Sequence, residues 1–215
     1  MNKLNLAIVD DHSLFRSGLK LLLRKSCDDI IDGIFEAGGG EQFLQLLKTQ
    51  RIDVALMDID MPDMNGIETT RLALCYDGAL KIIALTMFNH DDYYLKMINA
   101  GACGFLLKDA EIREVKKAII KVNDGETYFP GNVLYQIIKA DSATEADIVP
   151  AELSEREIEI LQLVCKGLSN HEIATELFLS KRTVDKHRSN LLFKTDCKNT
   201  AQLVVFAMKN KLVTL

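Results

Sequence analysis

The sequence predicts a doubly wound α/β domain with a parallel five-stranded sheet, followed by a small all-α domain of four helices. Two observations lead to this prediction. Over residues 1–125, short apolar runs alternate five times with longer segments of helical periodicity, the pattern of a parallel sheet covered on both faces. Beyond residue 150 no strand pattern remains, and a length of 215 residues suits two domains.

Five segments of the first part have the composition of buried strands, since most are continuous apolar runs. They are residues 4–10, 30–36, 54–58, 81–86 and 103–108. The segments that follow each of them carry apolar residues at three- and four-residue spacing, which predicts helices with one buried face. These helices are expected over residues 13–25, 40–49, 66–75, 91–101 and 110–125.

A change in composition separates the two domains. We expect a short helix over residues 126–140 and a linker to residue 150, because residues 139–150 are small and acidic and lack an apolar stripe. Residues 151–215 form the second domain, with helices predicted over residues 154–167, 169–178, 180–195 and 199–211. Ser154 with Glu157, and Ser169 with Glu172, fit capping boxes that start the first two of these helices.

The composition excludes several classes of protein. No window approaches the roughly 18 consecutive apolar residues of a membrane span, and the short apolar run near the start is too brief for a signal peptide. We therefore expect a cytoplasmic protein without a membrane partner. The five cysteines never form a C-x-x-C pair, which argues against a disulfide framework or a zinc site. The net charge is −5, but residues 151–215 carry 10 basic and 8 acidic residues.

Charged or hydroxyl side chains follow four of the five predicted strands, namely Asp10 with Asp11, Asp58, Thr86 and Lys108. Ligands of an open parallel sheet gather beyond the carboxyl ends of its strands, so these side chains are expected to lie together. Clustered carboxylates repel one another and favour a hard divalent cation, Mg²⁺ or Mn²⁺ in its place. A carboxylate beside such an ion can attack phosphorus and form an acyl phosphate, with a lysine and a hydroxyl as support.

The stretch "LMDIDMPDMNG" fits two other kinds of site less well. An EF-hand loop is excluded because Pro62 and Asp63 occupy the fifth and sixth positions counted from Asp58. The pair Asp58 and Asp60 also resembles the D-x-D motif of haloacid-dehalogenase-type phosphatases. In those enzymes the motif follows the first strand, whereas here it follows the third, so a Mg²⁺ phosphatase remains the weaker alternative.

Residues 1–125 resemble the receiver domain of two-component response regulators along every predicted strand, through "IVDDH", "LMDIDMPDMNG", "IALTMF" and "GFLLKDA". The resemblance implies a flavodoxin-like strand order, 2-1-3-4-5. It also implies roles for individual residues: Asp58 as phosphoacceptor, Asp10, Asp11, Asp58 and the backbone carbonyl of Asp60 as Mg²⁺ ligands, Thr86 as switch hydroxyl and Lys108 as phosphate-pairing lysine. Phe105 fills the position of the switch aromatic, where it can swing inward but lacks a hydroxyl. The side chains of Asp60 and Phe88 stand where the family tunes access of water to the acyl phosphate.

The third helix of the second domain is basic, with six basic residues against two acidic ones from Lys181 to Lys198, and Ser180 can cap its start. A short turn joins it to the helix before it, as in a helix-turn-helix. Exposed N–H groups and the helix dipole at such a start suit a phosphate backbone.

Residues 150–213 resemble the LuxR-type DNA-binding domain. The resemblance implies that Lys181, Arg182, Thr183 and His187 contact phosphates, and that Asp185, Lys186 and Ser189 face base edges. Asp185 is unusual there and could accept a hydrogen bond from a cytosine amino group. Thr195 replaces a usually apolar residue, which predicts looser packing under the last helix.

Together these features predict a phosphorylation-controlled transcriptional regulator of the NarL/FixJ type, not an enzyme in the ordinary sense. Its expected partners are a sensor histidine kinase, half-sites in double-stranded promoter DNA, and a second copy of itself when phosphorylated. The apolar last helix offers a dimer face, although core packing explains its composition equally well. A DNA-binding protein whose receiver is only a constitutive dimerisation module is the second alternative.

Overall fold

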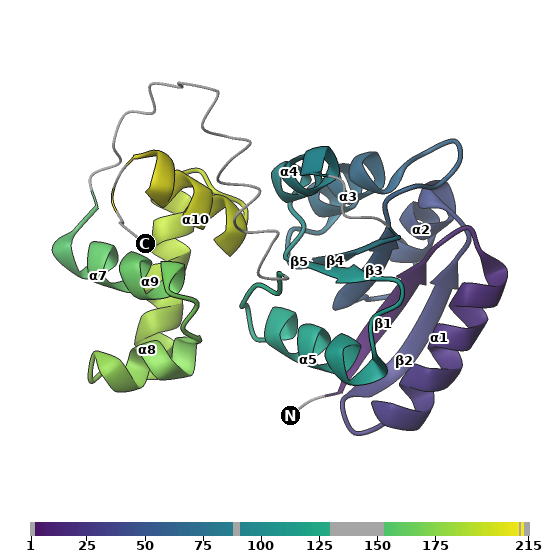
Figure 1. Ribbon diagram of the computed structural model, residues 1–215, viewed down its shortest axis with the longest axis horizontal. Helices are drawn as coiled ribbons and strands as arrows, with labels where there is room; N and C mark the ends of the chain where they lie inside the picture. The colour runs from purple at the N-terminus through teal and green to yellow at the C-terminus, as the bar shows by residue number, and fades with distance from the viewer. Residues whose placement is uncertain (1–2, 88–90, 130–152, 211, 213–215) are drawn as a thin grey trace. The chain divides into compact units, whose positions relative to one another are not determined.

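The computed structural model describes residues 3–87, 91–129, 153–210 and 212 of the chain (Figure 1). The chain divides into two compact units, Met1–Gly131 and Asn132–Leu215. Phe88, most of the helix expected over residues 126–140 and the linker lie outside the described residues. Among the described residues, no helix is both long enough and apolar enough to cross a bilayer.

The first unit is built on a five-stranded parallel sheet in the order β2-β1-β3-β4-β5, as predicted. Its strands are β1 (Leu4–Val9), β2 (Ile31–Ala37), β3 (Val54–Asp58), β4 (Lys81–Thr86) and β5 (Gly104–Leu107). Nearly every residue of β1, β3 and β4 is buried, because helices cover both faces of the sheet. This burial explains why those strands are continuous apolar runs and do not alternate with polar residues.

Five helices surround the sheet: α1 (Ser13–Ser26), α2 (Gly40–Leu47), α3 (Gly66–Tyr76), α4 (Asp91–Ala100) and α5 (Ile112–Asn123). α1 and α5 lie on one face, and α2, α3 and α4 lie on the other (Figure 1). The side chains of α1 and α5 that face the sheet pack with Leu6, Ile8, Leu56 and Ile83 into one apolar core. The carboxyl ends of the strands are thereby held at one rigid edge.

The turn after β3 brings its residues close to the start of α3. A Cβ atom at Gly66 would overlap the backbone carbonyl oxygen of Asp58, so only glycine fits there. The Gly66 N–H also donates to the carbonyl of Ile59 at 2.9 Å, and the Asn65 side chain caps α3 by accepting from Glu68 N–H. The Asn-Gly pair of the sequence therefore fixes the loop beside Asp58.

Residues after α5 return to the sheet as an extended segment. Tyr128 forms a parallel bridge with Gly104, and its carbonyl accepts a hydrogen bond from Phe105 N–H at 2.8 Å. The expected helix over residues 126–140 thus does not begin at Glu126, because this backbone pairs with the outer edge of β5.

The second unit contains four described helices, α7 (Glu155–Cys165), α8 (Asn170–Glu176), α9 (Lys181–Lys194) and α10 (Thr200–Lys209). Both predicted capping boxes, at Ser154 and Ser169, are present. Leu203, Val204 and Ala207 of α10 pack into the core of this unit. Core packing therefore accounts for the apolar face of the last helix.

Candidate phosphorylation site and nucleic-acid interface

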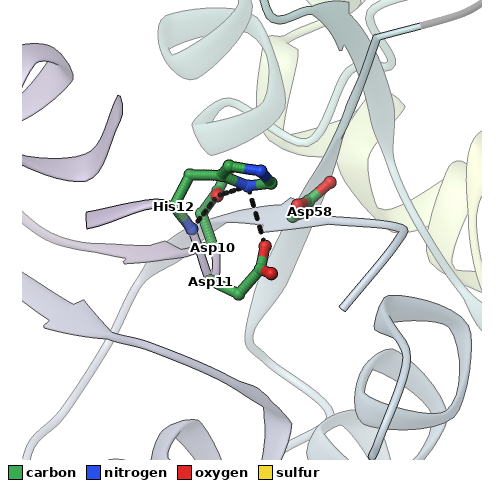
Figure 2. A group of neighbouring side chains, drawn as sticks. All are labelled: Asp10, Asp11, His12 and Asp58. Atoms are coloured by element: carbon green, nitrogen blue, oxygen red, sulfur yellow. Dashed lines mark hydrogen bonds and ion pairs between the residues drawn. The ribbon is translucent and has the colours of Figure 1, made fainter. Parts of the chain in front are cut away.

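The carboxylates predicted to meet at the edge of the sheet do meet there. Asp10 follows β1 and Asp58 ends β3, and both are almost fully buried, at 0% and 3% exposure. Asp11 is more exposed. One ligand atom each from Asp10, Asp11, His12 and Asp58 lies within 4.8 Å of all the others (Figure 2). His12 was not among the predicted site residues, although it follows the acidic pair directly in the sequence.

Lys108 joins the two buried carboxylates. Its Nζ atom lies 2.7 Å from Asp58 Oδ2 and 2.7 Å from Asp10 Oδ2, and its side chain is only 6% exposed. Burial lowers the pKa of Lys108, but its close contacts with the Asp10 and Asp58 carboxylates outweigh burial and raise it above its usual value. Lys108 is therefore held as a cation at the centre of the site.

Burial also acts on the aspartates. It raises the pKa of Asp58, with a further rise from the negative charge of Asp10, while the hydrogen bond from Lys108 opposes both. Asp10 Oδ2 is a buried atom that lacks a hydrogen-bond donor in good geometry. Its ion pair with Lys108 offsets part of the cost of burying its negative charge. Two buried anions thus share one buried cation. The donor set of carboxylates with residual negative charge fits a hard divalent cation.

The other acids of the β3 loop have different surroundings. The Asp60 side chain is exposed, while its backbone N–H donates a hydrogen bond to Asp58. Asp63 is exposed and adopts a left-handed conformation with φ of 63°. Asp63 therefore shapes the loop, and the metal-ligand role of the Asp60 carbonyl stays a prediction.

Thr86 and Phe105 lie on neighbouring strands beside this edge. Thr86 ends β4, and its carbonyl accepts a hydrogen bond from Lys108 N–H at 2.9 Å. The ring of Phe105 is 1% exposed and packs edge-on against Tyr94, with ring centroids 4.8 Å apart. Its ring also packs against that of Phe129, with ring centroids 5.7 Å apart. Phe105 is thus already turned inward, because aromatic rings from α4 and the segment after α5 enclose it.

The predicted DNA-contacting residues all belong to α9. Ser180 caps this helix by accepting from Thr183 N–H, while Val184 and Leu191 point into the core. Lys181, Arg182, Lys186 and Ser189 are exposed, and Thr183, Asp185 and His187 are half-buried. Lys181, Arg182 and Lys186 therefore stand on the face of α9 that the core does not occupy.

Asp185 has a partner within the domain. Its Oδ1 atom accepts a hydrogen bond from Asn170 Nδ2 at 2.7 Å, which ties α9 to the start of α8. Arg188, which is 6% exposed, donates to Asn170 Oδ1 and, at 2.6 Å, to Thr200 Oγ1. One network thus connects three helices, and in it Asp185 is directed toward Asn170.

The burial of Arg188 had a signal in the sequence. Val184, Arg188 and Leu191 follow one another at spacings of four and three residues, which places Arg188 on the core side of the helix. Because the helix is rich in basic residues, the core position of Arg188 was not recognised from the sequence. Thr195, expected to loosen the packing, satisfies its hydroxyl by donating to Leu191 O at 2.7 Å.

A second contact between helices involves Glu157 and Lys194. Glu157 closes the capping box of α7, and its side chain, 4% exposed, accepts a hydrogen bond from Lys194 of α9 at 2.8 Å. Burial would raise the pKa of Glu157, but hydrogen bonds from Lys194 and Ser154 outweigh burial and lower it. The ion pair therefore favours the folded state while Glu157 is ionised.

We expect acid to destabilise the second unit through Glu157. Because the pKa is lowered by folding, the contribution is complete above the ordinary value of 4.5 and is lost as the pH falls through the lower, folded value. Urea unfolding of the whole chain, followed at decreasing pH, should show a weaker pH dependence for Glu157→Gln than for the parent. Glu159→Gln, which alters an exposed pair with Arg156, should behave like the parent. Equal pH dependence in parent and Glu157→Gln would contradict this assignment.

Known proteins match both halves of the chain. The model of the response regulator receiver domain matches residues 6–120, and the model of the bacterial regulatory proteins of the luxR family matches residues 151–207. The transcriptional regulatory protein LiaR of Bacillus subtilis (strain 168) is 36% identical, with 96% of this chain and 97% of LiaR covered. The response regulator UvrY of Escherichia coli (strain K12) is 34% identical, with 97% and 95% covered.

A solved structure is similar over the same length. The crystal structure of the response regulator ChrA, from a heme-sensing two-component system, covers 99% of this chain and 100% of its own at 30% identity, with a TM-score of 0.52.

Proposed function

Since the chain belongs to the two-component response regulators with a LuxR-type DNA-binding domain, we propose that phosphorylation of Asp58 controls how this transcriptional regulator binds promoter DNA. The observation that carries the proposal is the buried Asp10–Lys108–Asp58 arrangement at the edge of the sheet. It combines a nucleophilic carboxylate with a fixed cation, as phosphoryl transfer requires. The cytoplasm, where DNA and a kinase domain are both accessible, is the proposed location.

The phosphoryl donor is the phosphohistidine of a sensor kinase. An Asp58 carboxylate oxygen attacks the phosphorus atom, a P–O bond forms, the P–N bond breaks, and the histidine nitrogen takes the electron pair. Asp10, Asp11, Asp58 and the Asp60 carbonyl would hold Mg²⁺, or Mn²⁺, which supplies neutralisation of phosphoryl charge. Lys108 pairs with a phosphoryl oxygen, and because it already touches Asp58 it needs little movement to do so.

Phosphorylation changes the partners of Lys108 and thereby the strands next to it. Lys108 exchanges its contact with the Asp58 carboxylate for a phosphoryl oxygen, and the Thr86 hydroxyl turns toward the new phosphoryl oxygens. Phe105 lies three residues before Lys108 on β5, and Leu107 pairs in register with Thr86. Movement at this edge therefore reaches the Phe105 ring through one short strand.

The Phe105 ring then acts on the chain that leads to the DNA-binding unit. The ring contacts that of Phe129, and the Phe105 backbone N–H donates a hydrogen bond to the Tyr128 carbonyl. Tyr128 and Phe129 come just before the segment that enters the second unit. The Tyr128 hydroxyl also bonds Glu114 of α5 at 3.1 Å. A change in Phe105 packing would alter how this segment is held on β5, which supports a two-state switch between the units.

Removal of the Phe129 ring should uncouple the two units. We expect Phe129→Ala to take up a phosphoryl group as the parent does but to lose most of the phosphorylation-dependent rise in DNA affinity, because the Phe105 ring loses its contact with the segment. Tyr76→Ala, which removes an exposed ring from α3, is the control and should keep the rise. A full rise in Phe129→Ala would exclude this route.

DNA binding is assigned to the exposed side of α9, with two copies of the chain on paired half-sites. Lys181, Arg182, Thr183 and His187 would contact phosphates, while Lys186 and Ser189 would face base edges. Asp185 reaches bases only when it leaves Asn170.

In a dimer the same surface of each copy meets its counterpart. Leu14 and Leu21 of α1 are 87% and 71% exposed, lie two turns apart on one side of the helix, and support a contact there.

The proposal is tested by measuring DNA affinity before and after phosphorylation. Acetyl phosphate and Mg²⁺ should raise the affinity for promoter DNA at least about tenfold, equivalent to about 1.4 kcal/mol, and light scattering should show a shift from monomer to dimer. Affinity should fall steeply with salt. Steady release of phosphate from aryl phosphates would identify a phosphatase instead. Dimerisation and DNA affinity independent of the phosphoryl donor would identify a constitutive dimerisation module.

A further inference from the structure

We propose that His12 is a nitrogen ligand of the divalent cation at the phosphorylation site and shifts its selectivity from Mg²⁺ toward Mn²⁺ and the later transition metals. This inference rests on the proposed function, because it assumes that Asp10, Asp11 and Asp58 hold a cation. It starts from the position of the imidazole, which Figure 2 shows against the two adjacent carboxylates. His12 Nδ1 lies 2.8 Å from Asp11 Oδ1 and 3.2 Å from Asp10 Oδ1.

These separations are those of neighbouring ligands around one ion. In octahedral coordination with metal–ligand distances of about 2.1 Å, adjacent ligand atoms are about 3 Å apart. The Nδ1 atom and the two carboxylate oxygens already have this spacing, and the chosen Asp58 oxygen is within the same 4.8 Å limit. A cation could therefore replace the contacts between these side chains without a large rearrangement.

Helix capping does not explain the position of the imidazole. His12 is the N-cap residue of α1, yet its side chain makes no capping hydrogen bond. The side chain is also 68% exposed, so packing does not press it against the acids. Its backbone N–H donates to Asp10 Oδ1 at 2.8 Å, which fixes His12 relative to the buried carboxylate. The imidazole thus stands beside the acids in a backbone geometry that is already set.

A nitrogen ligand affects different metals differently. Mg²⁺ prefers oxygen ligands and retains its water, so imidazole adds little to its binding. Imidazole suits Mn²⁺ less than Co²⁺, Ni²⁺ or Zn²⁺, but it binds all of them, and affinity at mixed nitrogen and oxygen sites rises from Mn²⁺ through Co²⁺ to Ni²⁺ and is also higher for Zn²⁺ than for Mn²⁺. His12 would consequently give this receiver a metal preference that carboxylates alone do not provide.

The decisive measurement is pulsed EPR of Mn²⁺ bound to the full-length chain. Modulation from a directly bound ¹⁴N nucleus is expected in the parent but not in His12→Asn. His171 is an exposed histidine of the other unit, so His171→Asn is the control and should keep the modulation. Asparagine is a favoured N-cap residue, so α1 should remain intact. His12→Ala serves as a second variant that lacks a side-chain oxygen.

Affinities provide the second readout. Calorimetry should show Mn²⁺ and Zn²⁺ affinity falling by about tenfold or more in both His12 variants, with Mg²⁺ affinity changed less than about twofold. If the Mn²⁺-loaded parent shows no ¹⁴N modulation, or if the His12 variants lose affinity equally for Mg²⁺ and Mn²⁺, the role of His12 is overturned. Neither result would contradict the proposed phosphorylation of Asp58. A parent that binds no divalent cation and accepts no phosphoryl group would overturn the proposed function as well.

Discussion

Asp58→Asn should take up no phosphoryl group from acetyl phosphate and Mg²⁺, whereas the parent should gain one. Asparagine has nearly the same shape but lacks the carboxylate oxygen that attacks phosphorus. The fold should survive the change, because Asp10 still pairs with Lys108 and one of two mutually repelling buried anions is gone. Intact-protein mass spectrometry counts the phosphoryl groups, and circular dichroism checks the fold.

The matched control for Asp58→Asn is Asp63→Asn. Asp63 lies in the same loop but is exposed, and its left-handed conformation is one that asparagine tolerates. Asp63→Asn should therefore gain one phosphoryl group like the parent. Uptake by Asp58→Asn with loss in Asp63→Asn would move the nucleophile to Asp63, and no uptake by the parent would remove the basis of the switch.

The residues around Asp58 show how far the sequence could predict the site. Asp10, Asp58, Thr86 and Lys108 follow consecutive parallel strands or end them, and the carboxyl ends of such strands meet at one edge whatever the details of packing. Their proximity could therefore be inferred without coordinates. The strand order was implied by the resemblance to receiver domains, and the capping boxes were predicted from the spacing of Ser and Glu alone.

Partners that depend on side-chain direction were not predictable in this way. Asp185 was placed on the correct helix and the acidic pair beside His12 was identified, but the contacts of His12 with Asp11 and of Asp185 with Asn170 were not predicted. Asn170 lies 15 residues before Asp185, on another helix, so no periodicity links the two. Phe129 reaches Phe105 because the backbone after α5 pairs with β5, where the sequence predicted a helix.

Arg188→Met should destabilise the second unit by about 2–4 kcal/mol, because charged hydrogen bonds at a buried position are lost and their partners stay buried. Methionine keeps the length and apolar stem of arginine but cannot donate to Asn170 or Thr200. Asn170, freed from Arg188, should also hold Asp185 less firmly. Urea unfolding of the whole chain, followed by circular dichroism, should show the second unit unfolding at lower denaturant.

Arg182→Met is the matched control, with the same substitution on the exposed side of the same helix. It should leave the unfolding transition unchanged, weaken DNA binding, and reduce the slope of log affinity against log salt by about one, as expected for one lost phosphate contact. Arg188→Met should instead lose affinity mainly in proportion to the fraction unfolded. An Arg188→Met protein with parental stability and a reduced salt slope would show that Arg188 contacts phosphate and that α9 is oriented by other residues.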